Sequence, residues 1–114
     1  MPNNHERYDD DKVAELIQQR LPGWRVEGTY LARTYDTGNW NRTMMLANAI
    51  AYLGEKAWHH PDLFLGYPSV KVLLTTHDAA GITARDVALA EEIERLAQWV
   101  PDREIFKDVE HWFD

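Results

Sequence analysis

The order of helical and extended segments restricts the fold of this chain more than any other feature of its sequence. Apolar residues recur at helical spacing over residues 9–20, 40–57 and 83–99, and a pair of short strand-forming segments lies in each gap between them. The element order is therefore α-β-β-α-β-β-α. This order predicts an α+β fold, in which a four-stranded antiparallel sheet carries helices packed on one face.

Proline, glycine and helix-capping residues predict where these segments end. Pro22-Gly23 ends the first helix, and Gly28 lies at the predicted turn between the two strands of residues 24–34. Thr83 is a suitable N-cap for the third helix. Each boundary thus has a residue whose conformational preference favours it.

The length of the chain, 114 residues, fits a single domain spanning residues 1–114. Pro101 closes the third helix, so that residues 101–114 form a C-terminal extension. Apolar residues recur at helical spacing in this extension; they are Ile105, Phe106, Val109, Trp112 and Phe113. We expect a short amphipathic tail helix that packs on the core or on a partner protein.

The charge balance narrows the range of partners. Twelve Lys and Arg residues against nineteen Asp and Glu residues give a net charge of −7, which disfavours nucleic acid and anionic membranes. A neutral or cationic small molecule, or another protein, is the better match. The chain contains no Cys, which excludes disulfides and thiolate chemistry. It has no apolar run of about 18 residues that could cross a bilayer, and we expect a soluble cytoplasmic protein.

The second pair of strands, residues 63–67 and 70–76, is predicted to form a hairpin about the Pro-Ser pair at 68–69. In that register His60 lies opposite His77. Residues opposed in this way have Cβ atoms about 5 Å apart. The hairpin would therefore bring two imidazoles together at its open end.

Three of the five histidines, His59, His60 and His77, are close to this hairpin in the sequence. Imidazole has an unperturbed pKa of about 6.5, so its acid and base forms are both available near neutral pH. Imidazoles placed around one pocket can therefore give one proton and take another, and such general acid–base catalysis contributes about 10² to 10⁴ in rate. Glu55 precedes His59 by four residues, and on a helix its carboxylate could orient that imidazole.

Simpler interpretations fit the same residues. His59 and His60 could be surface residues at a helix end, where a cationic imidazole interacts well with the helix dipole. His77 could merely close a strand. A metal site built from Glu55, His59 and His77 is a third alternative, although the absence of Cys and of HExxH spacing argues against it. Asp86 lies in a Thr-x-x-Asp pattern, which suits a helix capping box as well as a catalytic role.

A longer motif surrounds the histidines. It consists of residues 55–61 (Glu-Lys-Ala-Trp-His-His-Pro), Tyr67, residues 75–78 (Thr-Thr-His-Asp) and residues 81–86 (Gly-Ile-Thr-x-x-Asp), with Gly23-Trp24 and Arg33-x-Tyr35 upstream. This motif resembles the signature of the pterin-4a-carbinolamine dehydratases. The resemblance extends over about residues 20–97 and leaves out the C-terminal extension.

The resemblance implies an α+β fold that assembles into dimers or tetramers. It also implies a reaction that needs no metal and no organic cofactor. The reaction it implies removes water from 4a-hydroxytetrahydropterin and gives quinonoid dihydropterin, as in tetrahydrobiopterin recycling. The catalytic residues it implies are His59 and His77, as acid and base, and His60, which mainly holds the pterin. The other site residues it implies are Glu55, Trp58, Thr75, Thr76 and Asp78 around the substrate, with Asp86 in support.

A role without catalysis is the main alternative. Proteins of this family also serve as dimerisation partners of transcription factors, and relatives assist the assembly of carbon-fixation enzymes. Those assembly proteins generally lack the complete histidine set, so its presence here favours catalysis. Trp112 and Phe113 in the extension keep a protein partner open, and the bulk of Trp58 could narrow the pocket or stack on the ligand.

Overall fold

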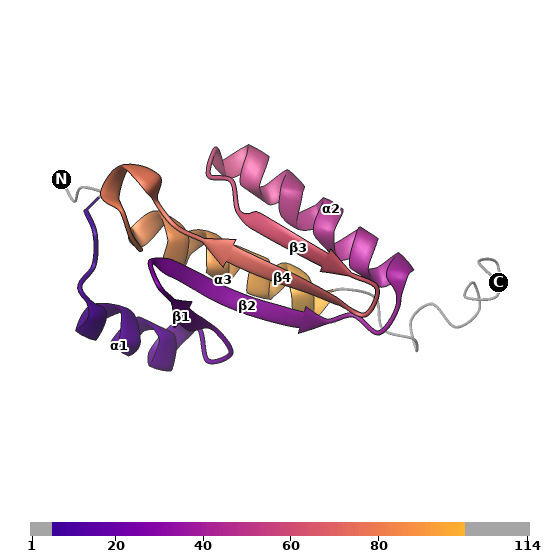
Figure 1. Ribbon diagram of the computed structural model, residues 1–114, viewed down its shortest axis with the longest axis horizontal. Helices are drawn as coiled ribbons and strands as arrows, with labels where there is room; N and C mark the ends of the chain where they lie inside the picture. Colours follow the sequence, from indigo (N-terminus) through magenta and orange to yellow (C-terminus); the bar gives the residue numbers. More distant parts are fainter. Residues whose placement is uncertain (1–5, 100–114) are drawn as a thin grey trace.

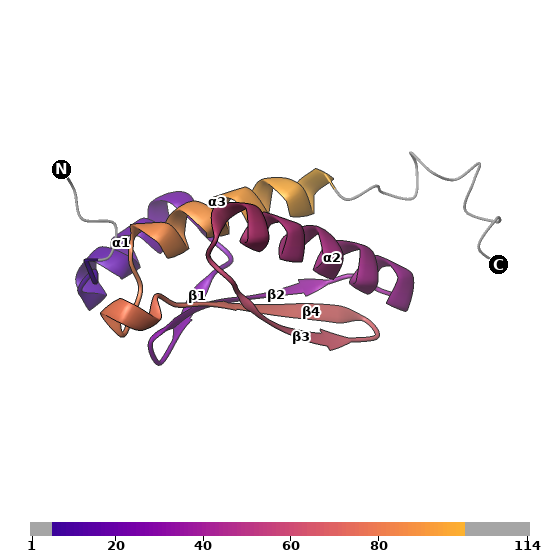
Figure 2. The ribbon, with the colours of Figure 1, turned by 90° about the horizontal axis from the view of Figure 1, so that it is seen from above.

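A computed structural model describes residues 6–99, which form one four-stranded sheet and the helices that cover it. In chain order the elements are α1 (Asp10–Arg20), β1 (Arg25–Glu27), β2 (Tyr30–Asp36), α2 (Trp40–Ala57), β3 (Asp62–Gly66), β4 (Ser69–Leu74), the 3₁₀ helix η1 (His77–Ala79) and α3 (Ala84–Trp99) (Figure 1). The sheet is antiparallel with the strand order β1-β2-β4-β3. Figure 2 shows the three α-helices on one face of the sheet, which confirms the predicted α+β architecture. The tail helix predicted for residues 101–114 lies outside the described residues.

The hydrophobic core lies between the sheet and the helices. β4 contributes Val70, Val72 and Leu74, each at most 1% exposed, as the alternation of the sequence predicts. The helices contribute Ile50 from α2 and Ile93 from α3, both fully buried. Burying such a side chain contributes about 1.5–3 kcal/mol, so this layer anchors α2 and α3 to the sheet. Within residues 6–99, no helix is both long and apolar enough to span a membrane.

The hairpin of β3 and β4 closes through a two-residue loop. Gly66 lies opposite Ser69, which leaves Tyr67 and Pro68 as the loop residues. The backbone N–H of Thr37 donates to the Pro68 carbonyl oxygen at 2.7 Å. The connection that leads into α2 therefore holds this loop in place.

This register corrects the predicted one. A turn at residues 68–69 would pair Leu63 with Leu74, but Leu63 pairs with Val72, two residues earlier. The prediction that His60 lies opposite His77 was therefore wrong, and neither histidine belongs to a strand. A shift of two residues leaves every side chain on the same face of the sheet, so hydrophobic alternation could not distinguish the two registers.

Gly54 allows the segment after α2 to pass close to the helix. A Cβ atom at this position would lie 2.7 Å from Cδ of Pro61. We expect Gly54→Ala to lower the free energy of unfolding by about 1–3 kcal/mol, because the overlap outweighs the roughly 1 kcal/mol that alanine gains in a helix. Urea unfolding measures the change. The exposed Ala51, changed to Gly, reports helix propensity alone, and a Gly54→Ala variant as stable as wild type would contradict the close packing.

A polar cluster joins the C-terminal half of α3 to the sheet. Oε1 of Glu94 accepts hydrogen bonds from Nε1 of Trp24 at 2.8 Å and from the Tyr35 hydroxyl at 2.6 Å. The Arg33 guanidinium lies over the Tyr35 ring, 4.8 Å from its centroid. Burial and the hydrogen bond to Glu94 raise the pKa of Tyr35 well above its ordinary value.

This raised pKa predicts a loss of stability at alkaline pH. The stabilisation from Tyr35 is fully present below pH of about 10, where the tyrosine of the unfolded chain is also neutral, and is lost as pH rises toward the folded-state pKa. We expect the free energy of unfolding to fall by about 1.4 kcal/mol per pH unit above 10, and Tyr35→Phe to remove this contribution. Unfolding measured from pH 8 to 11 checks it, with the exposed Tyr52→Phe as control. Equal slopes in wild type and Tyr35→Phe would contradict it.

Candidate active site

The end of α2 determines where His59 and His60 lie. Trp58 follows the helix with a left-handed backbone, φ 52°, a conformation that costs a non-glycine residue roughly 1–2 kcal/mol. The N–H of His59 returns to the carbonyl oxygen of Gly54 at 3.0 Å, which closes the last helical turn. The chain therefore leaves the helical path before His59, and the two histidines do not continue its spacing.

His59 is held by a buried carboxylate. Its Nε2 atom lies 2.5 Å from Oδ1 of Asp86 in the first turn of α3. The Asp86 side chain is completely buried and that of His59 is 10% exposed. Because an ionised carboxylate only accepts hydrogen bonds, Nε2 carries the proton in this pair and Nδ1 is the ring atom that can exchange one.

The second oxygen of Asp86 is also fully occupied. Oδ2 accepts from the Thr76 hydroxyl at 2.8 Å and from the backbone N–H of Thr83 at 2.9 Å. The hydroxyls of Thr76 and Thr83 lie 2.8 Å apart, and the Thr83 hydroxyl also accepts a hydrogen bond from the backbone N–H of Arg85. Asp86 thus caps α3, as its Thr-x-x-Asp pattern predicted, and orients His59 at the same time.

Glu55 contacts His60 and not His59. Its Oε2 atom lies 3.1 Å from Nε2 of His60, and both side chains are more than half exposed. The Trp58 ring meets the His60 ring edge to face, with centroids 5.0 Å apart. The prediction that Glu55 orients His59 was wrong, because the left-handed residue at position 58 ends the helical spacing on which it depended.

His77 lies at the start of η1 and is exposed. It directly follows Thr76, whose backbone pairs with Gly81 and whose hydroxyl binds Asp86. In the described part of the chain, no hydrogen bond or ion pair joins His77 to His59 or His60. The ends of α2 and β4, η1 and the start of α3 nevertheless gather at one end of the sheet (Figure 1).

Three further predictions concern Thr75, Asp78 and the alternative metal site. The Thr75 hydroxyl donates to the Thr29 carbonyl at 2.7 Å, so this predicted substrate-binding group stabilises the fold. Asp78 is exposed within η1. Among residues 6–99, no three His, Asp or Glu side chains converge as a metal site would require, so Glu55, His59 and His77 do not form the alternative metal centre.

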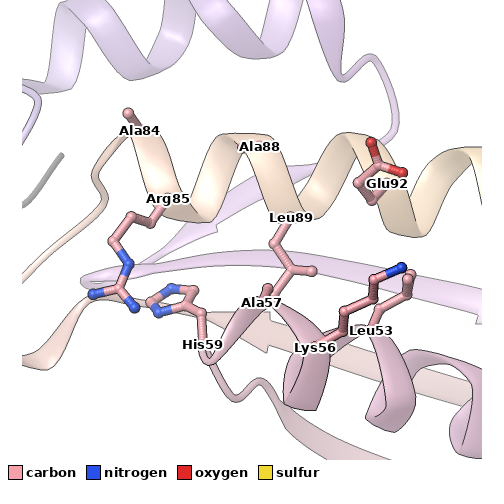
Figure 3. A pocket seen from close by; sticks show the side chains of 9 residues that line it. All are labelled: Leu53, Lys56, Ala57, His59, Ala84, Arg85, Ala88, Leu89 and Glu92. Atoms are coloured by element: carbon pink, nitrogen blue, oxygen red, sulfur yellow. The ribbon is translucent and has the colours of Figure 1, made fainter.

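His59 borders a groove of about 670 Å³ between α2 and α3 (Figure 3). The lining residues are Leu53, Lys56, Ala57, His59, Ala84, Arg85, Ala88, Leu89 and Glu92. His59 alone among the predicted site residues is one of them. The sequence did contain a signal for the groove, since small residues at 84 and 88 share one face of α3, but that signal cannot show which helix they oppose.

Arg85 connects the groove to the end of α2. Its Nη2 atom donates to the Trp58 carbonyl oxygen at 2.9 Å, across the mouth that His59 borders. This contact holds the strained Trp58 backbone against α3. Arg85 is therefore a site residue that the sequence alone did not single out.

Comparisons with known proteins agree on one family. Residues 6–96 match the family model described as pterin 4 alpha carbinolamine dehydratase. A Thermomicrobium roseum protein with the provisional name pterin-4-alpha-carbinolamine dehydratase is 47% identical over 91 residues, which cover 80% of this chain and 97% of that protein. An Aquifex aeolicus protein with the same provisional name is 46% identical over 80 residues, 70% of this chain and 81% of that protein.

A solved structure shares the fold. The crystal structure described as a transcriptional coactivator/pterin dehydratase from Brucella melitensis matches with a TM-score of 0.74 and 26% identity, covering 81% of this chain and 99% of that chain. The fold and site define an α+β protein with a histidine–carboxylate pair between two helices that cover one face of a sheet. The chain belongs to the pterin-4a-carbinolamine dehydratase family.

Proposed function

We propose that this protein dehydrates a 4a-hydroxytetrahydropterin to quinonoid dihydropterin and water, with His59 as a proton-transfer residue. The observation that carries the proposal is His59 itself, which borders a groove while a buried carboxylate fixes its Nε2 atom. A ring held in one orientation, with Nδ1 able to exchange a proton, suits general acid–base catalysis. The family names of the relatives support the same reaction.

The reaction needs two proton transfers on neighbouring atoms. Protonation of the C4a hydroxyl lets it leave as water while the N5 electron pair forms the C4a–N5 double bond, and N5 then loses its proton. We assign these transfers to His59 and His77, and the holding of the pterin ring to His60. Positioned groups of this kind replace the random encounter of substrate with buffer.

The test is to mix the protein rapidly with freshly generated carbinolamine and to measure the rate of dehydration by absorbance. We expect the wild-type protein to accelerate the reaction over buffer alone and to do so equally well in EDTA. A rate equal to that of buffer would overturn the proposal. Activity that disappears in EDTA would instead support a metal-dependent hydrolase or lyase.

We also propose that the protein is a cytoplasmic homodimer or homotetramer. Whether it binds another protein through the C-terminal extension is part of the same test. β1 and β3 are the edge strands of the sheet, and β3 exposes 58% of Phe64. Exposed edges of a small sheet favour pairing across a two-fold axis. Light scattering of the full chain and of a chain truncated after Pro101 separates assembly by the domain from assembly by the extension. Unchanged dehydration after truncation, together with a lost partner or oligomer, would assign residues 102–114 to binding.

A further inference from the structure

The groove between α2 and α3 extends beyond the histidine that the proposed reaction uses. Figure 3 shows His59 and Arg85 at one end, with Lys56 and Glu92 at the other. The volume of about 670 Å³ lies within the range of about 300–1,000 Å³ in which proteins bind drug-sized ligands. A bicyclic ring placed beside His59 would leave the far part of the groove for another portion of the ligand.

The groove is shaped by short side chains. Ala84 and Ala88 are one turn apart on α3, and Ala57 is the last residue of α2. These methyl groups cannot fill the space between the two helices, while Leu53 and Leu89 give it an apolar wall. A slender ligand segment would fit such a channel, and a larger side chain at position 88 would obstruct it.

The charge of the groove is opposite in sign to that of the whole protein. Lys56 and Arg85 line it together with one carboxylate, Glu92, although the chain has a net charge of −7. Glu92 is already paired with Arg95 on its own helix. Among residues 6–99, Lys56 forms no ion pair. A ligand with a negative charge would therefore meet an available ammonium group at the far end.

The chemistry of the substrate supplies the connection between the two ends. In a tetrahydropterin, C6 is bonded directly to N5, one of the two atoms at which protons move. A substituent at C6 therefore begins beside the residue that serves N5. If His59 serves that atom, the substituent enters the groove that His59 borders and runs toward Lys56.

We propose that this groove binds an anionic substituent carried at C6 of the reduced pterin, with Lys56 as its counter-ion. The proposal rests on the proposed dehydratase function and adds the class of substrate. The anion could be a phosphate ester or a carboxylate, since both accept hydrogen bonds from an ammonium group. Each is tested separately below.

Binding of oxidised pterins, followed by their fluorescence, tests the groove without any turnover. The probes are hydroxymethylpterin, its phosphate ester and carboxypterin, each with its substituent at C6. We expect the wild-type protein to bind at least one of the two anionic probes about tenfold more tightly than the neutral one, with an advantage that shrinks as salt rises. Lys56→Gln should reduce the advantage to about twofold, and Ala88→Leu should weaken binding of the phosphate ester.

Matched variants control for charge and for bulk. Lys12→Gln removes an exposed lysine from α1, and Ala51→Leu enlarges an exposed alanine of α2 outside the groove; both should retain the tenfold advantage. Equal binding of all three probes by wild type, or an anion preference that survives Lys56→Gln, would overturn the proposal.

The result is distinguishable from failure of the reaction. If the protein dehydrates a carbinolamine with only a methyl group at C6 but shows no preference for the anionic probes, only the proposed binding of an anionic C6 substituent is contradicted. A protein that dehydrates nothing contradicts the proposed function, and a Lys56-dependent preference for the anionic probes would then still support the groove as an anion site.

Discussion

Replacing His59 with glutamine is expected to lower the turnover of carbinolamine dehydration by about 10² to 10⁴ while leaving the fold intact. The Gln amide retains an N–H group that can donate to Oδ1 of Asp86, so the buried carboxylate keeps its third hydrogen bond. The amide cannot gain or lose a proton near neutral pH. The variant therefore separates the proposed catalytic role of His59 from its structural role.

His60→Gln is the comparison for this variant. His60 is exposed and contacts Glu55, and in the proposed function it holds the pterin without moving a proton. We expect a higher KM with a smaller change in kcat for this variant. Urea unfolding of both variants should agree with wild type within about 1 kcal/mol, since neither removes a buried partner.

Chemical rescue provides a readout that a merely structural role would not change. His59→Ala opens space where the ring lay, and free imidazole can enter from the adjoining groove. We expect added imidazole to restore part of the turnover of His59→Ala and none of the turnover of His59→Gln. Wild-type turnover in either variant would remove His59 from the proposed mechanism.

The elements of the fold were predictable because their signals are local. Asn39 accepts a hydrogen bond from the N–H of Arg42, and the helix it caps ends at Ala57, as the sequence pattern indicated. The register of the second hairpin was not predictable, because registers two residues apart bury the same side chains. The 3₁₀ helix at His77–Ala79 also lacked a signal, since its short turn depends on the bridge between Thr76 and Gly81.

The site was predictable only in part, for a related reason. A short spacing suggested that Glu55 supports His59, but the partner of His59 is Asp86, 27 residues away in the sequence. That contact exists because α3 packs beside the end of α2, and no periodicity encodes which helices pack together. The resemblance to a family pointed to Asp86 as a supporting residue, but only the structure shows that Asp86 contacts His59.

Asp86 should have the largest effect on stability of any single residue in the site. Asp86→Ala removes three hydrogen bonds at once: it leaves the Thr83 N–H and the His59 N–H without an acceptor in a buried place, and it leaves the Thr76 hydroxyl only the Thr83 hydroxyl as a partner. Losing the acceptor of buried donors costs about 1–3 kcal/mol each, and relaxation or entry of water offsets part of the sum. We expect a loss of about 3–5 kcal/mol in the free energy of unfolding, measured in urea.

Asp86→Asn should lose activity while losing less stability. The amide oxygen can replace Oδ2 and accept from Thr76 and Thr83, but the amide NH₂ then faces Nε2 of His59. Two donors cannot pair, so the imidazole must move its proton to Nδ1, and this atom, to which we assign the proton transfer, becomes a donor in place of an acceptor. Turnover should fall by about 10² to 10⁴, with most of the stability retained.

The exposed Asp62 at the start of β3 provides the matched control, because Asp62→Asn makes the same chemical change at a carboxylate that, within residues 6–99, forms no hydrogen bond with an imidazole. That variant should retain wild-type turnover and stability. If Asp86→Asn retained wild-type turnover as well, the tautomer of His59 would not matter to the reaction. Asp86 would then act only as the cap of α3, and the proton transfers assigned to His59 would have to belong to another group.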